Sequence, residues 1–212
     1  PLWEALSKKG VRFQFFHRVS DISCMDGEEA TDRVTRITVQ QQLRLAEGVE
    51  EYRPLKEVKG VPSYPSAPLW EQIAPEDRER YQKEPWRLES AWGNVEPVTT
   101  KVLEAGKDFD VVVLGLSSQG LAAVAPTLVQ HHGAVQKVAS MATVQTIAAQ
   151  VWMKESVEKM GWQKGSVVGD NYAGPHDTWA EMTELLRRED WGEAPPQSLI
   201  YLCGTYPDAT PI

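Results

Sequence analysis

The sequence predicts an α+β fold: a mixed sheet with antiparallel hairpins and packing helices. Three observations predict it. The run 111–116 (VVVLGL) is apolar and rich in valine, as in a strand buried on both faces. Residues 33–39 alternate between polar and apolar, as in a strand with one wet face. The pattern over 121–131 indicates a helix, with Ser117 and Ser118 before it as N-cap residues.

The first half of the chain predicts short elements. Residues 2–6 form an amphipathic helix that ends at Gly10. A strand over 11–16, continued or bent by 17–22, is expected to pair with 33–39 as an antiparallel hairpin around the turn 25–28. Pro75 stands in the first turn of a predicted helix over 75–81.

The second half predicts a hairpin, a helix and further strands. Residues 98–103 and 109–116 are expected to pair across a five-residue loop that contains Gly106. Strands are expected at 143–147, 167–169 and 198–204, and 148–152 fits either a strand or a helix. A helix is expected from Asp177 or Thr178 to Arg188, because apolar side chains recur there at helical spacing.

Three segments are expected: 1–51, 52–97 and 98–212. The middle segment is rich in proline, which excludes long regular elements. Its aromatic residues need something to pack on, so it is expected to be a lid or insertion folded against the main body; they are Tyr64, Trp70, Tyr81, Trp86 and Trp92.

Composition excludes several classes of protein. The chain has 212 residues, of which 42% are hydrophobic, and a net charge of −8. Without a block of basic residues, nucleic acid is not expected as a partner. Cys24 and Cys203 are far apart and have no metal or redox spacing, so they are interpreted as buried reduced thiols. No apolar stretch is long enough to span a bilayer.

No motif indicates a self-sufficient catalytic centre, and neither a catalytic residue nor a metal ligand is predicted. Gly115 and Gly120 have the glycine spacing of a phosphate-binding loop without its Lys and Ser/Thr. This loop follows an expected strand, which is where α/β sheets place ligands. Two other interpretations of this loop stay open. In the first it simply connects a core strand to a packing helix, and in the second the protein is a nucleotide-binding enzyme that uses this loop itself.

Three stretches resemble the flavin-containing amine oxidoreductase superfamily, and within it the branch of carotenoid (phytoene and zeta-carotene) desaturases. They are 3–13 (WEALSKKGVRF), 15–22 (FFHRVSDI) and 109–114 (FDVVVL). Shorter matches are Gln145-Thr146, Asp177-Thr178-Trp179 and Glu189-Asp190-Trp191. The resemblance spans nearly the whole chain and is weakest over 52–97.

This resemblance implies an interior piece of an FAD-dependent enzyme, with both ends continuing into the parent chain. The piece would hold part of an FAD/NAD(P)-binding-like domain and a substrate or cap domain, without the glycine-rich fingerprint and the carboxyl-terminal flavin segment. The implied contacts on the adenine side are Arg18 and Val19, and those near the dinucleotide are Leu114, Gly115, Leu116 and Ser117. Ser117 stands where the family often has proline.

The expected function is therefore the substrate chamber and adenine-side FAD contacts of an oxidoreductase that acts on a lipophilic or amine substrate. Candidate substrate residues are Thr143, Gln145 and Trp152. FAD is expected in the parent protein and not in this chain alone. The expected location is cytoplasmic, with peripheral membrane contact as a variant. The alternative is a non-catalytic binding or interaction module that keeps the fold without the cofactor.

Overall fold

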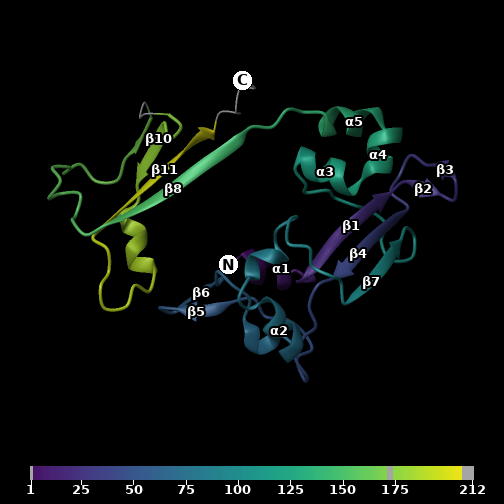
Figure 1. Ribbon diagram of the computed structural model, residues 1–212, viewed down its shortest axis with the longest axis horizontal. Coiled ribbons are helices and arrows are strands. Elements are labelled where there is room, and N and C mark those ends of the chain that lie inside the picture. Colours follow the sequence, from purple (N-terminus) through teal and green to yellow (C-terminus); the bar gives the residue numbers. More distant parts are fainter. Residues whose placement is uncertain (1, 171–173, 207–212) are drawn as a thin grey trace. The chain divides into compact units, whose positions relative to one another are not determined.

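The structure of the protein, a computed structural model, describes residues 2–170 and 174–206 (Figure 1). The chain divides into two units. The first is Pro1–Leu55 with Tyr64–Met141, and the second is Lys56–Ser63 with Ala142–Ile212. The boundaries expected after residues 51 and 97 both fall inside the first unit. The stretch 52–97 is instead shared, because its residues 56–63 belong to the second unit.

A three-stranded antiparallel sheet organises the first unit. Its strands are β1 (His17–Ser23), β4 (Arg36–Gln41) and β7 (Thr99–Glu104), in the order β1-β4-β7. The short hairpin β2 (Met25–Asp26) and β3 (Glu29–Ala30) joins β1 to β4. The predicted α+β class and the antiparallel pairing of the first two strands are confirmed. The predicted strand over 11–16 is wrong, because Phe16 has a φ of 58° and the extended backbone begins only at His17.

Helices cover one face of this sheet. Ile22, Ile37 and Leu103 lie opposite one another across the three strands. Ile22 of β1 is buried in a cluster with Cys24, which follows β1, and with Leu121, Ala125 and Leu128. Leu121 belongs to α3 (Ser118–Val124), Leu128 belongs to α4 (Pro126–His131), and Ala125 joins the two helices. The same side carries α5 (Gly133–Ala139), and Figure 1 shows these three helices together in teal.

The helix predicted over 121–131 is two helices. Pro126 lacks the backbone N–H that would continue α3, and the preceding residue, Ala125, has non-helical torsion angles (φ −129°, ψ 50°). The predicted cap is present, since the Ser117 hydroxyl accepts a hydrogen bond from the Gly120 N–H at 3.0 Å.

The apolar run 111–116 is not a strand, which corrects the predicted hairpin with 98–103. β7 pairs with β4 along its whole length, from Thr99↔Gln41 to Glu104↔Arg36. A tight turn follows β7, in which the Glu104 N–H donates to Asp108 Oδ2 at 2.9 Å. The run then continues without pairing to any strand of the described residues.

A four-stranded antiparallel sheet forms most of the second unit. Its order is β8-β11-β10-β9, with β8 (Gln145–Met153), β9 (Val168–Gly169), β10 (Thr178–Glu181) and β11 (Ser198–Tyr206). The hairpin of β5 (Lys56–Val58) and β6 (Val61–Ser63) also belongs to this unit. The strands predicted around residues 145, 168 and 200 are thus confirmed, and 148–152 is strand.

The helix predicted over 177–188 is wrong in its first half. Residues 178–181 are β10, which pairs with β11 on one side and with β9 on the other. Only Thr183–Arg188 is helical, as the 3₁₀ helix η3. Strand pairing on both sides of Trp179 and Ala180 overrides the helical spacing of the later apolar side chains.

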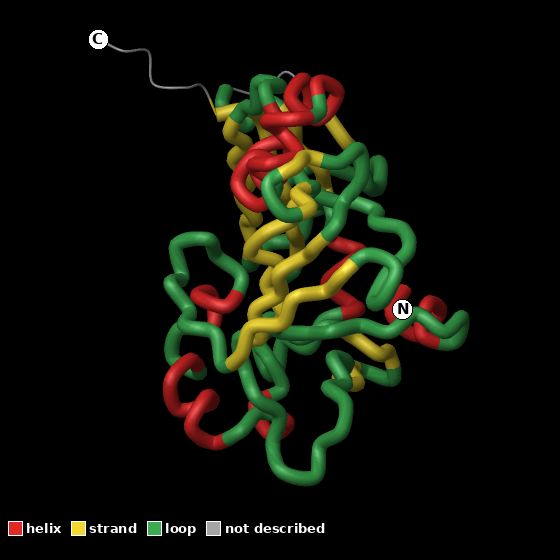
Figure 2. The backbone as a smooth tube through the Cα atoms, turned by 90° about the vertical axis from the view of Figure 1, so that its right-hand side faces the viewer, coloured by secondary structure: helices red, strands yellow, loops and turns green. Residues whose placement is uncertain are grey.

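The proline-rich stretch packs on the first unit through short helices joined by loops, drawn as green tube in Figure 2. Its helices are the expected α2 (Pro75–Tyr81) and the 3₁₀ turns η1 (Trp70–Gln72) and η2 (Pro85–Leu88). They build a second core cluster of Leu43, Tyr52, Ile73, Tyr81, Leu88 and Val95. The predicted packing of this stretch against the body therefore holds for Tyr81, whereas Trp92 is 89% exposed.

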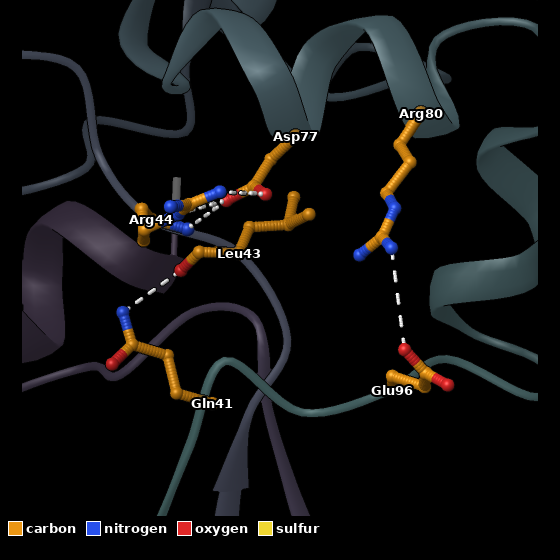
Figure 3. A network of polar contacts seen from close by, with 6 residues as sticks. All are labelled: Gln41, Leu43, Arg44, Asp77, Arg80 and Glu96. Atoms are coloured by element: carbon orange, nitrogen blue, oxygen red, sulfur yellow. Dashed lines mark hydrogen bonds and ion pairs between the residues drawn. The ribbon is translucent and has the colours of Figure 1, made fainter.

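One ion pair anchors α2 to the chain that follows β4. Asp77 is 1% exposed, and its carboxylate accepts from the Arg44 backbone N–H at 2.8 Å, Nε at 3.0 Å and a terminal guanidinium nitrogen at 2.7 Å (Figure 3). The Ala74 N–H donates back to the Arg44 carbonyl at 3.0 Å. Burial alone would raise the pKa of Asp77, but the hydrogen bonds and the charge of Arg44 outweigh it and lower this pKa.

We expect Asp77→Asn to lower the free energy of unfolding by about 2 kcal/mol at pH 7, since charge-assisted hydrogen bonds are lost. The folded-state pKa of Asp77 is lowered, so its stabilisation is complete above the unfolded-state pKa of about 4 and is lost as the pH falls below it. The difference between the two proteins should therefore shrink at pH 3. Urea unfolding followed by circular dichroism measures both effects.

Glu96→Gln is the matched control, because the Glu96 carboxylate is 83% exposed and lies 4.0 Å from Arg80 (Figure 3). It should change the stability by less than about 0.5 kcal/mol. Equal losses in the two variants would contradict a special role for the buried pair.

Candidate functional site

The predicted adenine-side residues lie on β1. The Arg18 guanidinium donates to Gln40 Oε1 at 2.6 and 3.1 Å and to the Val95 carbonyl at 3.3 Å. Val19 pairs with Val39 and is 37% exposed. β1 is an edge strand that pairs only with β4 in the sheet. The Arg18 side chain is therefore engaged within the unit, whereas the outer backbone edge of β1 is not paired with another strand of the described residues.

The predicted dinucleotide-side residues lie on the loop between β7 and α3. Leu114 is 38% exposed and Leu116 is 44% exposed, and the Ser117 side chain serves as the cap of α3. A side chain at Gly115 would meet no other atom within 4 Å. α3 in turn contacts β1, so these four residues and the adenine-side pair belong to neighbouring parts of one unit.

The predicted substrate residues lie in the second unit and do not form one patch. Thr143 precedes β8, Gln145 begins it, and Trp152 stands near its end. β8 is paired with β11 without a bulge, so the seven-residue separation places Gln145 and Trp152 about 23 Å apart on opposite faces of the sheet. Trp152 packs against Trp191, with ring centroids 6.0 Å apart. The Trp152 end of β8 thus has a pair of tryptophan rings, whereas Gln145 lies opposite Tyr206 of β11.

Sequence reasoning missed a hollow in the first unit, which we call the aromatic hollow. It consists of two adjoining depressions of about 140 and 400 Å³. Both are lined by Phe15, Phe16, Ser66, Pro68 and Glu89. The smaller one adds Tyr52, Pro54, Tyr64, Pro65 and Ala67, and the larger adds His17, Gln42, Pro85, Trp86 and Leu88.

Tyr52 lines the smaller depression and packs against both phenylalanines of the hollow. Its ring lies 5.2 Å from Phe15 and 4.8 Å from Phe16 between centroids, the second pair edge to face. Such pairs add about 0.5–1.5 kcal/mol each to the burial of the rings. The Tyr52 hydroxyl accepts a hydrogen bond from the Leu69 N–H at 2.9 Å, and burial raises its pKa.

Phe16 adopts a left-handed backbone conformation at the rim of the hollow. A φ of 58° costs a bulky residue about 1–3 kcal/mol. The Phe16 carbonyl accepts from the Gln42 N–H at 2.7 Å, and Gln42 is itself buried. The contacts with Tyr52 and Gln42 therefore maintain a strained backbone that turns consecutive phenylalanines toward one ring.

The polar groups of the hollow are mainly acceptors. The Gln42 amide nitrogen donates to the Leu88 carbonyl at 2.9 Å, which leaves its oxygen as an acceptor. His17 Nδ1 lies 2.6 Å from the Phe15 carbonyl, so Nδ1 carries the proton and Nε2 of the neutral ring is an acceptor. No Lys or Arg lines either depression, and the Glu89 carboxylate is exposed.

The signal that could have identified this hollow was the phenylalanine cluster immediately before the expected β1. Phe15 and Phe16 precede His17, and the sequence interpretation assigned them to the strand itself. The aromatics of the 52–97 stretch were noted, but their partners across the fold were not. Tyr64 and Trp86 are 56% and 54% exposed, so they form open walls and not core.

Among the described residues, no group of three or more His, Cys, Asp and Glu side chains could hold a metal ion. The two cysteines are free thiols in different units. His132 Nε2 lies 2.9 Å from the Thr31 carbonyl, which gives that ring a structural contact.

No protein-family model, curated protein or solved structure matches this chain. None of the helices in the described part of the chain has the length and apolar character to cross a membrane.

Tyr52→Phe should lower the free energy of unfolding by about 1 kcal/mol, because the Leu69 N–H loses its acceptor. Tyr64→Phe is the control, since it removes a hydroxyl from a residue that is 56% exposed and should leave stability unchanged. Urea unfolding measures the free energy of unfolding of both variants. An equal loss in the two would contradict the assigned role of the Tyr52 hydroxyl.

Proposed function

We propose that this chain is an interior part of an FAD-dependent oxidoreductase similar to amine oxidases and carotenoid desaturases. In this proposal it supplies the substrate chamber and the contacts on the adenine side of FAD. The parent enzyme oxidises or desaturates a lipophilic or amine substrate.

The exposed apolar run 111–116 is the observation that carries the proposal. Val111 is 80% exposed and Val113 is 91% exposed. Each fully buried valine contributes about 1.5–3 kcal/mol relative to an exposed one, so a valine-rich run in water forgoes a large stabilisation. A strand of a nucleotide-binding sheet, whose remaining strands come from another segment of the parent chain, accounts for this sequence and this exposure.

Residues of β1 are the proposed contacts on the adenine side of FAD. Half of the backbone N–H and C=O groups of an edge strand point away from its partner and can meet the polar edge of a purine. β1 is such a strand, and Val19 lies on it. The bonds of Arg18 to Gln40 and Val95 keep β1 in register with β4 and so position this edge.

The chemistry would be supplied by the bound flavin, which accepts a hydride equivalent from a substrate carbon. The chain's own residues bind and orient the substrate and exclude water from it. In the second unit, Trp152 and Trp191 offer an apolar wall for this task. Gln145 lies at the other end of β8 and on the opposite face of the sheet, so the proposed wall is assigned to Trp152 and Trp191 and not to Thr143 or Gln145.

A longer chain that includes the preceding glycine-rich segment is expected to purify with flavin absorbance near 450 nm, whereas the 212-residue chain is expected to be colourless. Absorption spectra of both proteins test this expectation. A colourless longer chain would overturn the oxidoreductase proposal and leave the non-catalytic binding module, which the aromatic hollow favours because residues of one unit complete it.

Val113→Asp tests the proposed burial of the run. In the 212-residue chain the substitution should leave the unfolding midpoint unchanged, because Val113 is 91% exposed. In the longer chain it should abolish flavin retention, since a carboxylate would enter a buried strand.

Val138→Asp on α5 is the matched control, as Val138 is also an exposed valine. It should leave flavin retention intact. Retention of flavin by the Val113→Asp variant would show that the run stays in solvent and would contradict the proposal.

A further inference from the structure

We infer that the aromatic hollow binds an organic ammonium ion: a protonated amine that carries an apolar or aromatic group. The inference concerns the first unit alone and does not depend on the flavin proposal. It rests on the shape of the hollow, its acceptors and its charge.

The apolar part of such a ligand has walls to pack on. Phe15, Phe16 and Pro68 line both depressions, and Trp86 lines the larger one. Depressions of about 140 and 400 Å³ that adjoin each other suit a small ring with a charged arm. The strained backbone at Phe16 is the kind of feature that concentrates at binding sites.

The charged part has acceptors and no competing donor cation. A primary ammonium group needs up to three acceptors. The residues that line the larger depression include Glu89, Gln42 and His17, whose carboxylate, amide oxygen and Nε2 are able to accept hydrogen bonds. An ammonium ion near aromatic faces gains a further attraction from the ring quadrupoles. An anionic ligand would be repelled by the Glu89 charge and would find no Lys or Arg among the lining residues, so a cation is favoured.

The nearest arginine in the sequence is occupied elsewhere. Arg87 donates to the carbonyls of Gly93 at 2.8 Å and Asn94 at 3.3 Å, and it lies 3.6 Å from the Glu84 carboxylate. Its guanidinium also lies over the Tyr81 ring, 5.6 Å from the centroid. These contacts hold Arg87 in place, so it does not neutralise Glu89, for which no ion pair exists among the described residues.

The test is isothermal titration of the 212-residue chain with 2-phenylethylammonium at pH 7.5. The neutral analogue 2-phenylethanol has nearly the same shape without the positive charge, and 3-phenylpropionate carries a carboxylate on the same two-carbon arm. We expect the ammonium ion to bind at least about tenfold more tightly than the alcohol, and the anion not to bind. Equal affinity for the ammonium ion and the alcohol would overturn the inference.

Variants locate the site. Glu89→Gln and Trp86→Leu should each weaken binding about fivefold to tenfold, because one removes the charge and the other an aromatic face. Glu47→Gln removes the same charge from an exposed residue outside both depressions and should leave the affinity unchanged. Unchanged affinity in Glu89→Gln, or an equal loss in Glu47→Gln, would place the ammonium ion elsewhere and overturn the assignment.

A lysine side chain of a peptide carries the same ammonium group as a small amine ligand. A lysine-containing peptide such as acetyl-Gly-Lys-Gly-amide lacks the aromatic body and should bind more weakly than 2-phenylethylammonium. Tighter binding of the peptide would indicate that the ligand is a lysine side chain and not a small amine, and would overturn the inference. All of these measurements use the chain without flavin, so they are independent of the outcome of the spectral test.

Discussion

The buried carboxylate of Asp77 is the constraint on which the first unit depends. It accepts three hydrogen bonds from one residue, Arg44, and is almost fully withdrawn from solvent. Because a buried charge without partners is costly, the first turn of α2 and the segment after β4 must stay together. The isolated bridge between Leu45 and Ile73 continues the same junction.

This junction determines the geometry of the aromatic hollow. It joins α2 to the segment after β4, and Tyr52, between them in the sequence, contacts Phe15, Phe16 and Leu69 through its ring and hydroxyl. The walls of the hollow thus come from both sides of the ion pair in the sequence: the phenylalanines precede β1, whereas Trp86 and Glu89 follow α2. A binding surface built from such distant segments exists only when the anchor between them is made.

The apolar run and the aromatic hollow both expose apolar side chains, but they support different functions. The run 111–116 exposes aliphatic side chains along a loop without strand pairing among the described residues, which suits a segment that is completed by further structure. The hollow exposes aromatic faces beside acceptors, and residues of one unit supply all of it. The first supports a role within a larger flavoprotein, and the second supports binding by this chain itself.

Local signals predicted the elements that depend on a few neighbouring residues. The Ser117 cap and the proline start of α2 both appear in the structure, because each depends on residues within one helical turn. Pro126 divides the helix predicted over 121–131 for a local reason, whereas the wrongly predicted strand at 111–116 and helix at 178–181 depend on distant partners. β7 pairs with β4 and not with the apolar run, and residues 178–181 form a strand that pairs with β11 and β9.

The sequence by itself therefore determined the α+β class, most strand positions and the caps, since these follow from periodicity and local chemistry. Only the tertiary structure decided which strands pair, where the two units divide and how Glu89 comes to lie beside Phe16. The physical reason is that pairing and hollow formation depend on contacts between residues far apart in the chain. No local pattern in the sequence specifies those contacts.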